Sequence, residues 1–148
     1  MSRADSLRDL EQEVGVMIRR IRRVIWERAR AVHPELMPTS YLVLTLLAQN
    51  GAMRPSAVAE KFDIDKGAIS RQVQHLCQLG LLVRVPDPDD GRASLISASD
   101  DALRRLADVD DRRRKWLGER LGEWSAADLR DFVAGLTRYN RALDSLPK

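Results

Sequence analysis

An aspartate and an arginine two positions apart are the side chains best placed to bind a charged partner. Asp90 and Arg92 belong to the segment 86–92, which contains two prolines, three aspartates and a glycine and therefore indicates a stiff polar loop. The Asp90 carboxylate can hold the Arg92 guanidinium in place before binding. An arginine presented in this way suits the narrow, electronegative minor groove of A·T-rich DNA. The alternative is a solvated loop charge paired with Asp90.

Polar side chains also gather on one face of a helix predicted at residues 66–79. The apolar positions of its docking face recur at helical spacing: Ile69, Val73 and Leu76. On the remaining face, Arg71 could read guanine through two hydrogen bonds and Gln74 could read adenine. Every surface helix has a polar face, so a solvated surface is the alternative. The candidate DNA-binding residues are Lys66, Gly67, Ala68, Ser70, Arg71, Gln74, His75, Asp90 and Arg92.

The start of this helix is a further candidate contact with DNA. Free N–H groups and the helix dipole favour an anion at a helix N-terminus. The small residues Gly67 and Ala68 would allow a close approach. We therefore expect the first turn of the helix to meet the phosphate backbone.

The elements around these residues must position them. A short helix follows Pro55, which suits a first helical turn, and Asp65 can cap the helix 66–79. The extended segments 81–85 and 93–97 then flank the polar loop, which predicts a β-hairpin. Two helices joined by a short turn and followed by a hairpin predict a winged helix-turn-helix, whose second helix enters the major groove.

Amphipathic helices precede this lobe. Apolar residues recur at spacings of three and four from Leu7 to Ile25. This helix should end near Pro34, because proline disfavours a helical conformation in the residue before it. A second helix is expected to start at Thr39 or Ser40, which are good N-caps.

Two more helices are predicted after the hairpin. Ser99 is expected to cap a long helix that ends or weakens at Gly122. Ser125 and Asp128 have capping-box spacing before the last helix, and Pro147 closes the chain. A lone small lobe could not bury all the apolar residues of the terminal helices, so we expect a dimer. The candidate anchors of its interface are Trp116, Trp124, Phe132 and Tyr139.

The chain resembles the MarR family of bacterial transcription regulators over nearly its whole length. The most specific match is the family's Asp-x-Arg wing motif, here residues 90–92. The run 66–84 also resembles the family's recognition helix and first wing strand. Where the family usually has Leu-Thr and, three residues later, a glycine, this chain has Ala98, Ser99 and Ala102. The departure is mild, because serine can cap a helix as threonine does.

The resemblance implies a homodimer built by interlocking N- and C-terminal helices. It places two recognition helices, residues 66–79, in successive major grooves of double-stranded DNA at a pseudo-palindromic operator. Two wings, residues 86–93, would occupy the flanking minor grooves. Many members release DNA when a small phenolic or lipophilic anion binds between the dimer helices and the DNA-binding lobe. The candidate effector-pocket residues are Trp26, His33, Tyr41 and Trp116, with a role in the core as the alternative.

Together these observations predict a mainly α (α+β) fold: a winged helix-turn-helix lobe with a small β-hairpin wing, flanked by dimerisation helices. Residues 37–98 would form the DNA-binding lobe, residues 1–36 the N-terminal dimerisation helix and residues 99–148 the C-terminal ones. The expected function is that of a homodimeric, sequence-specific transcription regulator, a repressor released by a small molecule. The alternative is a winged-helix protein–protein interaction module that does not bind DNA.

Composition excludes several other classes. One cysteine and two histidines among 148 residues leave no disulfide framework and no zinc-ligand cluster, so no metal or cofactor is expected. Cys77 is interpreted as a small buried hydrophobe rather than a redox switch. No nucleophile motif or glycine-rich phosphate loop is present, so no enzyme is expected. No apolar run approaches the ~20 residues of a membrane span, and we expect a cytoplasmic protein.

The charge balance is a weaker guide. The net charge is +3, and 21 of the 25 basic residues are arginine, which suits forked contacts to phosphate or carboxylate. The segment 54–97 contains six basic and six acidic residues, so DNA affinity must come from their arrangement. The arginine clusters at 19–23 and 112–115 are interpreted as solvated, salt-bridged faces, with phosphate contact as the alternative.

Overall fold

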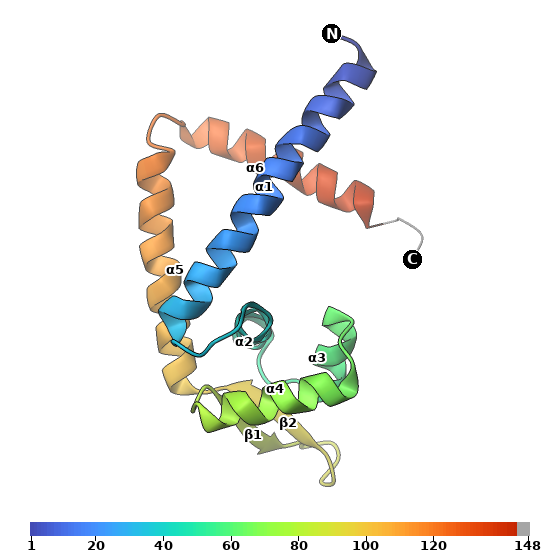
Figure 1. Ribbon diagram of the computed structural model, residues 1–148, viewed down its shortest axis with the longest axis vertical. Coiled ribbons are helices and arrows are strands. Elements are labelled where there is room, and N and C mark those ends of the chain that lie inside the picture. Colours follow the sequence, from blue (N-terminus) through green and yellow to red (C-terminus); the bar gives the residue numbers. More distant parts are fainter. Residues whose placement is uncertain (145–148) are drawn as a thin grey trace. The chain divides into compact units, whose positions relative to one another are not determined.

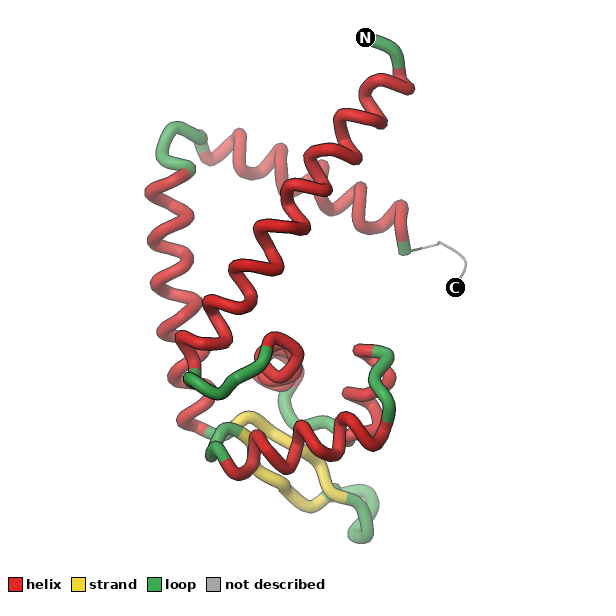
Figure 2. The backbone as a smooth tube through the Cα atoms, viewed as in Figure 1, coloured by secondary structure: helices red, strands yellow, loops and turns green. Residues whose placement is uncertain are grey.

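The computed structural model describes residues 1–144, mostly as helix, with one small antiparallel hairpin (Figures 1 and 2). Its elements are α1 (Arg3–Val32), α2 (Pro38–Asn50), α3 (Pro55–Phe62), α4 (Lys66–Gln78), β1 (Leu82–Pro86), β2 (Ser94–Ala98), α5 (Asp100–Arg120) and α6 (Ala126–Leu143). The predicted mainly α fold with a β-hairpin wing is confirmed. Pro147, expected to close the chain, lies outside the described residues, as do the last four residues of the segment 99–148.

Helix α2 begins earlier than the sequence pattern predicts. The helix starts at Pro38, and Met37, in extended backbone with φ −86° and ψ 156°, is the N-cap without a side-chain hydrogen bond. The expected start at Thr39 or Ser40 is therefore wrong. Proline suits the first helical position because its φ is preset and the N–H that it lacks would have no partner there.

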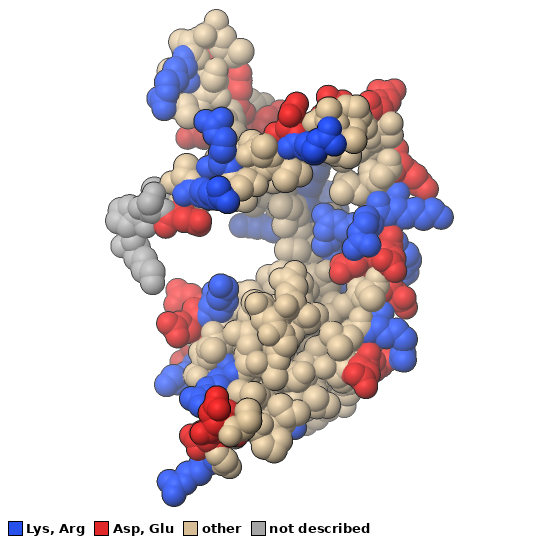
Figure 3. All heavy atoms as spheres, turned by 180° about the vertical axis from the view of Figure 1, so that it is seen from behind, with Lys and Arg blue, Asp and Glu red and all other residues tan. Residues whose placement is uncertain are grey.

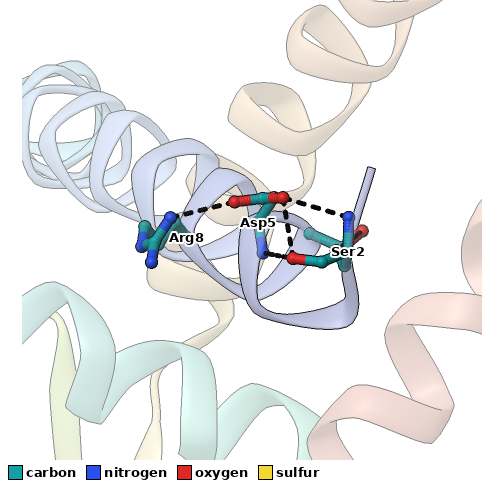
Figure 4. Close-up of polar contacts among 4 residues, drawn as sticks. Ser2, Asp5 and Arg8 are labelled. Atoms are coloured by element: carbon teal, nitrogen blue, oxygen red, sulfur yellow. Dashed lines mark hydrogen bonds and ion pairs between the residues drawn. The ribbon is translucent and has the colours of Figure 1, made fainter.

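Capping boxes begin the two terminal helices. In α1, the Ser2 hydroxyl accepts from the Asp5 amide at 3.1 Å and the Asp5 carboxylate accepts from the Ser2 amide at 3.0 Å (Figure 4). Arg8 adds an exposed ion pair to Asp5 at 2.9 Å. In α6, the predicted box is confirmed: Ser125 and Asp128 exchange the equivalent bonds at 3.0 and 2.8 Å. Both helices therefore start where their sequences satisfy the free N–H groups.

Residues Met1–Asp110 form one compact unit around a single apolar core. The end of α1 contributes Ala29 and Val32, and α2 contributes four buried apolar residues. Buried side chains of α3, α4, the hairpin and the first turns of α5 complete the cluster. The helix-turn-helix thus shares its core with the end of α1 and the start of α5.

Backbone hydrogen bonds hold strand β2 along both of its edges. Strands β1 and β2 pair in register from Leu82 opposite Ala98 to Pro86 opposite Ser94, each strand one residue later than predicted. Met53 forms a β-bridge with Ile96, with N–H···O bonds of 3.0 and 2.8 Å. Strand β2 therefore has β1 on one edge and Met53 on the other, which restrains the direction of the hairpin.

Gly80 and Ser99 join the end of α4 to the start of α5. Gly80 has φ +76°, a left-handed conformation that glycine adopts without a steric penalty. The Ser99 hydroxyl donates to the Gly80 carbonyl at 2.7 Å and accepts from the Ala102 amide at 3.1 Å. The predicted cap at Ser99 is confirmed, and it also holds the base of the hairpin.

The second compact unit starts at Asp111 and contains the rest of α5 and α6. None of the described residues of α6 is buried, although the helix carries a clear apolar face. Trp124 and Phe132 pack edge to face, with ring centroids 5.7 Å apart. Phe132 is 53% exposed and Val133 59% exposed. The structural division at residue 110 differs from the predicted functional division into 1–36, 37–98 and 99–148, which stays a prediction.

Candidate nucleic-acid interface

Helix α4 presents one face to the core and the other to solvent, as predicted. Ile69, Val73 and Leu76 are at most 2% exposed and hold the helix in place. Most of the candidate DNA-binding residues on α4 lie on the opposite, exposed face: Lys66, Gly67, Ser70, Arg71 and Gln74. Ala68 and His75 are half-buried at its margins. A helix with this polarity can enter a groove while its apolar face stays packed.

The first turn of α4 is capped from within the chain. Asp65 accepts hydrogen bonds from the Gly67 amide at 3.1 Å and the Ala68 amide at 3.4 Å. The cap at Asp65 is confirmed, and it uses two of the N–H groups that were expected to face a phosphate, the Gly67 and Ala68 amides. A phosphate contact at this helix start stays a prediction. The aspartate that begins the helix already occupies these two donors, and its charge opposes a second anion there.

Gly67 lies beside the Arg71 guanidinium and leaves room for the Asp65 carboxylate. A methyl group added at Gly67 would lie 3.7 Å from Arg71 Nη1 and only 3.0 Å from the Asp65 carboxylate. Gly67 and Arg71 are therefore neighbours one turn apart on the exposed face. Because glycine has no side chain, nothing protrudes at position 67 beside Arg71, which favours a close approach of α4 to a base edge.

Hydrogen bonds within the wing, residues 86–93, shape its tip. The Asp87 amide donates to the Ala93 carbonyl at 3.2 Å, and the Ala93 amide donates to the Asp90 carbonyl at 3.0 Å. The Asp90 carboxylate accepts from the backbone N–H of Arg92 at 3.0 Å. Within residues 1–144 it makes no ion pair with the Arg92 guanidinium, so the expected contact is corrected: Asp90 orients the Arg92 backbone. The exposed guanidinium remains available to a ligand.

Asp87 anchors the wing in a way that the sequence analysis missed. Arg54, just before α3, contacts one Asp87 carboxylate oxygen from Nε at 2.8 Å and from Nη2 at 2.7 Å. The other oxygen accepts from the Asp89 amide at 2.9 Å. The Asp87 side chain is only 5% exposed. The sequence carries one local signal of this contact. Asp87 lies between two prolines and two residues before Asp89, a spacing that is typical of an Asx turn.

These contacts lower the pKa of Asp87. The largest cause is the hydrogen bond from the Asp89 amide, followed by the hydrogen bond from Arg54. A carboxyl whose pKa is lowered by folding stabilises the folded state at every pH above its ordinary pKa of about 4. That stabilisation is lost as the pH falls through the lowered value.

Acid is therefore expected to release the wing anchor. As the pH falls through the lowered pKa of Asp87, its protonated carboxyl should weaken its bonds to the Asp89 amide and Arg54, because a neutral carboxyl is the poorer acceptor. The shift of the Asp89 amide signal by NMR measures this release. Asp87→Ala, which removes the acceptor, should show the released signal at every pH, whereas Asp89→Asn, which alters an exposed carboxylate, should keep the transition. An Asp89 amide unaffected by Asp87→Ala would contradict the anchor.

The candidate effector residues lie in different settings. Tyr41 is 3% exposed and belongs to the core, which is the alternative given for it. His33 is half-buried, and its Nδ1 accepts from the Glu35 amide at 3.0 Å. Trp26 and Trp116 are 44% and 52% exposed, each with an arginine guanidinium within 6 Å of its ring centroid. Trp116 belongs to the second compact unit, and the effector pocket stays a prediction.

Several features of residues 1–144 also bear on metal, membrane and redox sites. Within residues 1–144, no three His, Cys, Asp or Glu side chains are arranged to hold a metal ion. In the same residues, no helix combines the length and apolar character needed to cross a membrane. Cys77 is partly buried against the core. Basic and acidic side chains are interspersed on the face shown in Figure 3, rather than gathered in one broad basic surface.

Known proteins are similar to this chain in sequence and in fold. Residues 36–93 match the model of the MarR family. The uncharacterized HTH-type transcriptional regulator YxaD of Bacillus subtilis is 32% identical over 133 residues, which cover 90% of this chain and 92% of the relative. The HTH-type transcriptional regulator MT0903.1 of Mycobacterium tuberculosis is 30% identical over 129 residues, with 87% and 88% covered.

Solved structures with lower identity show the same fold. RV1404 from Mycobacterium tuberculosis aligns with a TM-score of 0.78 at 18% identity, over 96% of this chain and 95% of that one. A mutant MarR from E. coli, solved in complex with operator DNA, aligns with a TM-score of 0.64 at 16% identity, over 94% and 99%. With a recognition helix, a hairpin wing and relatives that match almost its whole length, the chain belongs to the MarR family of HTH-type transcriptional regulators.

Proposed function

We propose that the protein is a homodimeric repressor that binds a pseudo-palindromic operator, with α4 in the major groove and the wing in the minor groove. The observation that carries the proposal is that one lobe presents two exposed binding elements, α4 and the wing. Helix α4 is held by its buried face, and the wing is held by Asp87 and Arg54. Arg71 and Arg92 are both exposed on these elements. A regulator that binds operator DNA must have access to it, which supports the cytoplasmic location that we propose.

The proposed dimer is supported by apolar side chains that a single chain leaves exposed. On α1, Leu7, Leu10, Ile18 and Ile21 are each 43–45% exposed. On α6, no described residue is buried. Exposed apolar faces of this extent usually mark an interface, and a symmetric dimer covers each face with a copy of the chain.

Release by a small anion is supported by Arg28 on α1. Its Nε and Nη2 atoms are buried and have no hydrogen-bond partner within the residues that the structure describes. Buried guanidinium donors are normally satisfied, so an anionic group is the ligand that this position favours. The carboxylate or phenolate of an effector would supply the missing acceptor.

Selection from a random 30-base-pair library tests the function. The wild-type protein is expected to enrich one pseudo-palindromic sequence, and footprinting on that duplex should protect two successive major grooves and their flanking minor grooves. Addition of an aromatic carboxylate should remove the protection. Failure to retain any duplex at low salt would favour the protein–protein module instead.

Arg71→Ala is expected to relax base preference at one position in each half-site. Loss of a bidentate arginine contact costs about 1–3 kcal/mol at that position, while phosphate contacts elsewhere are retained. Repeating the selection with the variant measures the change. A profile identical to that of the wild-type protein would remove Arg71 from base readout.

A further inference from the structure

We propose that an open hollow between α3, α4 and β1 is a seat for one phosphate of the DNA backbone. The proposal rests on the proposed DNA-binding function. The hollow has a volume of about 210 Å³. Its polar lining comes from three elements: Ser56 of α3, Lys66 and Ser70 of α4, and Arg84 of β1. The apolar side chains of Ile69 and Val73 also line it.

The hollow is basic although the lobe around it is neutral. Within residues 1–144, neither Lys66 nor Arg84 forms an ion pair with a carboxylate. Two acids on the adjoining segments have other partners, since Asp65 caps α4 and Asp87 binds Arg54. Two cations without a counter-charge therefore line one small hollow, which attracts an anion.

Hydrogen-bond donors supplement these charges. Pro55 has no N–H, and the amides of Ala57 and Val58 both donate to the Arg54 carbonyl, at 3.0 and 3.2 Å. Within the described residues, the Ser56 amide has no acceptor. Together with the hydroxyls of Ser56 and Ser70, it can serve phosphate oxygens that the cations do not reach. A tetrahedral phosphodiester, with its charge spread over two free oxygens, fits this mixed donor set.

The path of the DNA backbone indicates that the hollow binds a backbone phosphate. In duplex DNA, one phosphodiester strand separates each major groove from the adjacent minor groove. If α4 occupies the major groove and the wing occupies the minor groove, that strand must cross the protein between them. Strand β1 leads from α4 to the wing, and Arg84 is its middle residue. The hollow is therefore on the line that the backbone must follow.

This arrangement is distinct from the phosphate contact expected at the start of α4. Asp65 occupies two of the N–H groups there, whereas the hollow beside the same helix offers free donors and two cations. A contact of this kind carries no sequence information, but it fixes the register of α4 in the groove. Arg84 is a phosphate-contacting residue on this proposal.

Salt dependence of binding to the selected duplex tests the seat. Each neutralised phosphate contributes about 0.9 to the slope of log affinity against log salt, so Arg84→Ala should make the slope shallower, by at most about 1.8 for a dimer because Lys66 still lines each seat. Arg84→Lys, which keeps the charge, should restore most of the slope. The matched control Arg104→Ala removes an exposed arginine of α5 that pairs with Asp101, and should leave the slope unchanged. The base preference of Arg84→Ala should equal that of the wild-type protein.

Methylphosphonate substitution locates the phosphate and needs no protein variant. One position in each half-site, on the strand between the two occupied grooves, should weaken wild-type binding most, and Arg84→Ala should be insensitive there. An unchanged salt slope in Arg84→Ala, or equal sensitivity of both proteins at every phosphate, would overturn the seat. Failure of the wild-type protein to select any duplex would instead refute the proposed function.

Discussion

Replacing Arg92 by alanine is expected to weaken binding to each operator half-site about 5- to 150-fold, a loss that the dimer makes twice, while leaving the Tm and the mass of the dimer unchanged. The loss corresponds to about 1–3 kcal/mol, the usual contribution of a specific arginine contact. The guanidinium is exposed and makes no ion pair within the described residues, so its removal leaves no buried group unsatisfied. Titration of the selected duplex at fixed salt measures the affinity, and thermal unfolding measures the stability.

Two further variants separate the wing contact from a general effect of charge. Arg104→Ala changes the net charge by the same amount on an exposed position of α5 and should bind normally. Arg92→Lys keeps the charge but loses the planar fork, so its affinity should lie between those of the wild-type and alanine proteins. In footprints of Arg92→Ala on the selected duplex, protection should be lost only in the flanking minor grooves. Equal affinity of Arg92→Ala and the wild-type protein would exclude a wing contact.

The sequence predicts the DNA-binding lobe well because its boundaries depend on local chemistry. Asp65 caps α4 through amides two and three residues away, and Gly80 ends the helix with a positive φ. Such signals act over one helical turn and can be recognised without knowledge of the fold. The same locality explains the error in α2, where Pro38 at the first helical position displaced two good capping residues.

Contacts between distant residues could not be predicted in this way. Arg54 and Asp87 are 33 positions apart, and only the folded lobe brings the start of α3 beside the wing. The phosphate seat likewise combines Ser56, Lys66 and Arg84 from three elements. For Asp90, the sequence predicted the right partner residue but the wrong atom, because a carboxylate two residues before an N–H reaches the backbone more readily than a mobile guanidinium.

The exposed face of α6 leads to the second prediction with a large effect: Val133→Glu should convert the dimer to a monomer. Val133 is 59% exposed in the single chain and lies beside Phe132 on the apolar face. Covering a valine contributes about 1.5–3 kcal/mol, whereas burying an unpaired carboxylate is costly. A twofold axis presents every interface residue twice, so the penalty is doubled. Light scattering should give 16.8 kDa for the variant and twice that mass for the wild-type protein.

Loss of the dimer should also remove most of the affinity for DNA, although α6 is not expected to touch it. Two half-sites bound by one rigid dimer gain about 100- to 10,000-fold over a single half-site, because the second contact is intramolecular. The matched control is Arg138→Gln, which changes the charge by the same amount on the polar side of α6 and should remain a dimer with normal affinity. Binding of Val133→Glu to an isolated half-site should equal that of one wild-type lobe, which separates loss of assembly from misfolding. A Val133→Glu protein that stays dimeric would place the interface on another face, and a monomer with undiminished operator affinity would contradict the paired engagement of two recognition helices.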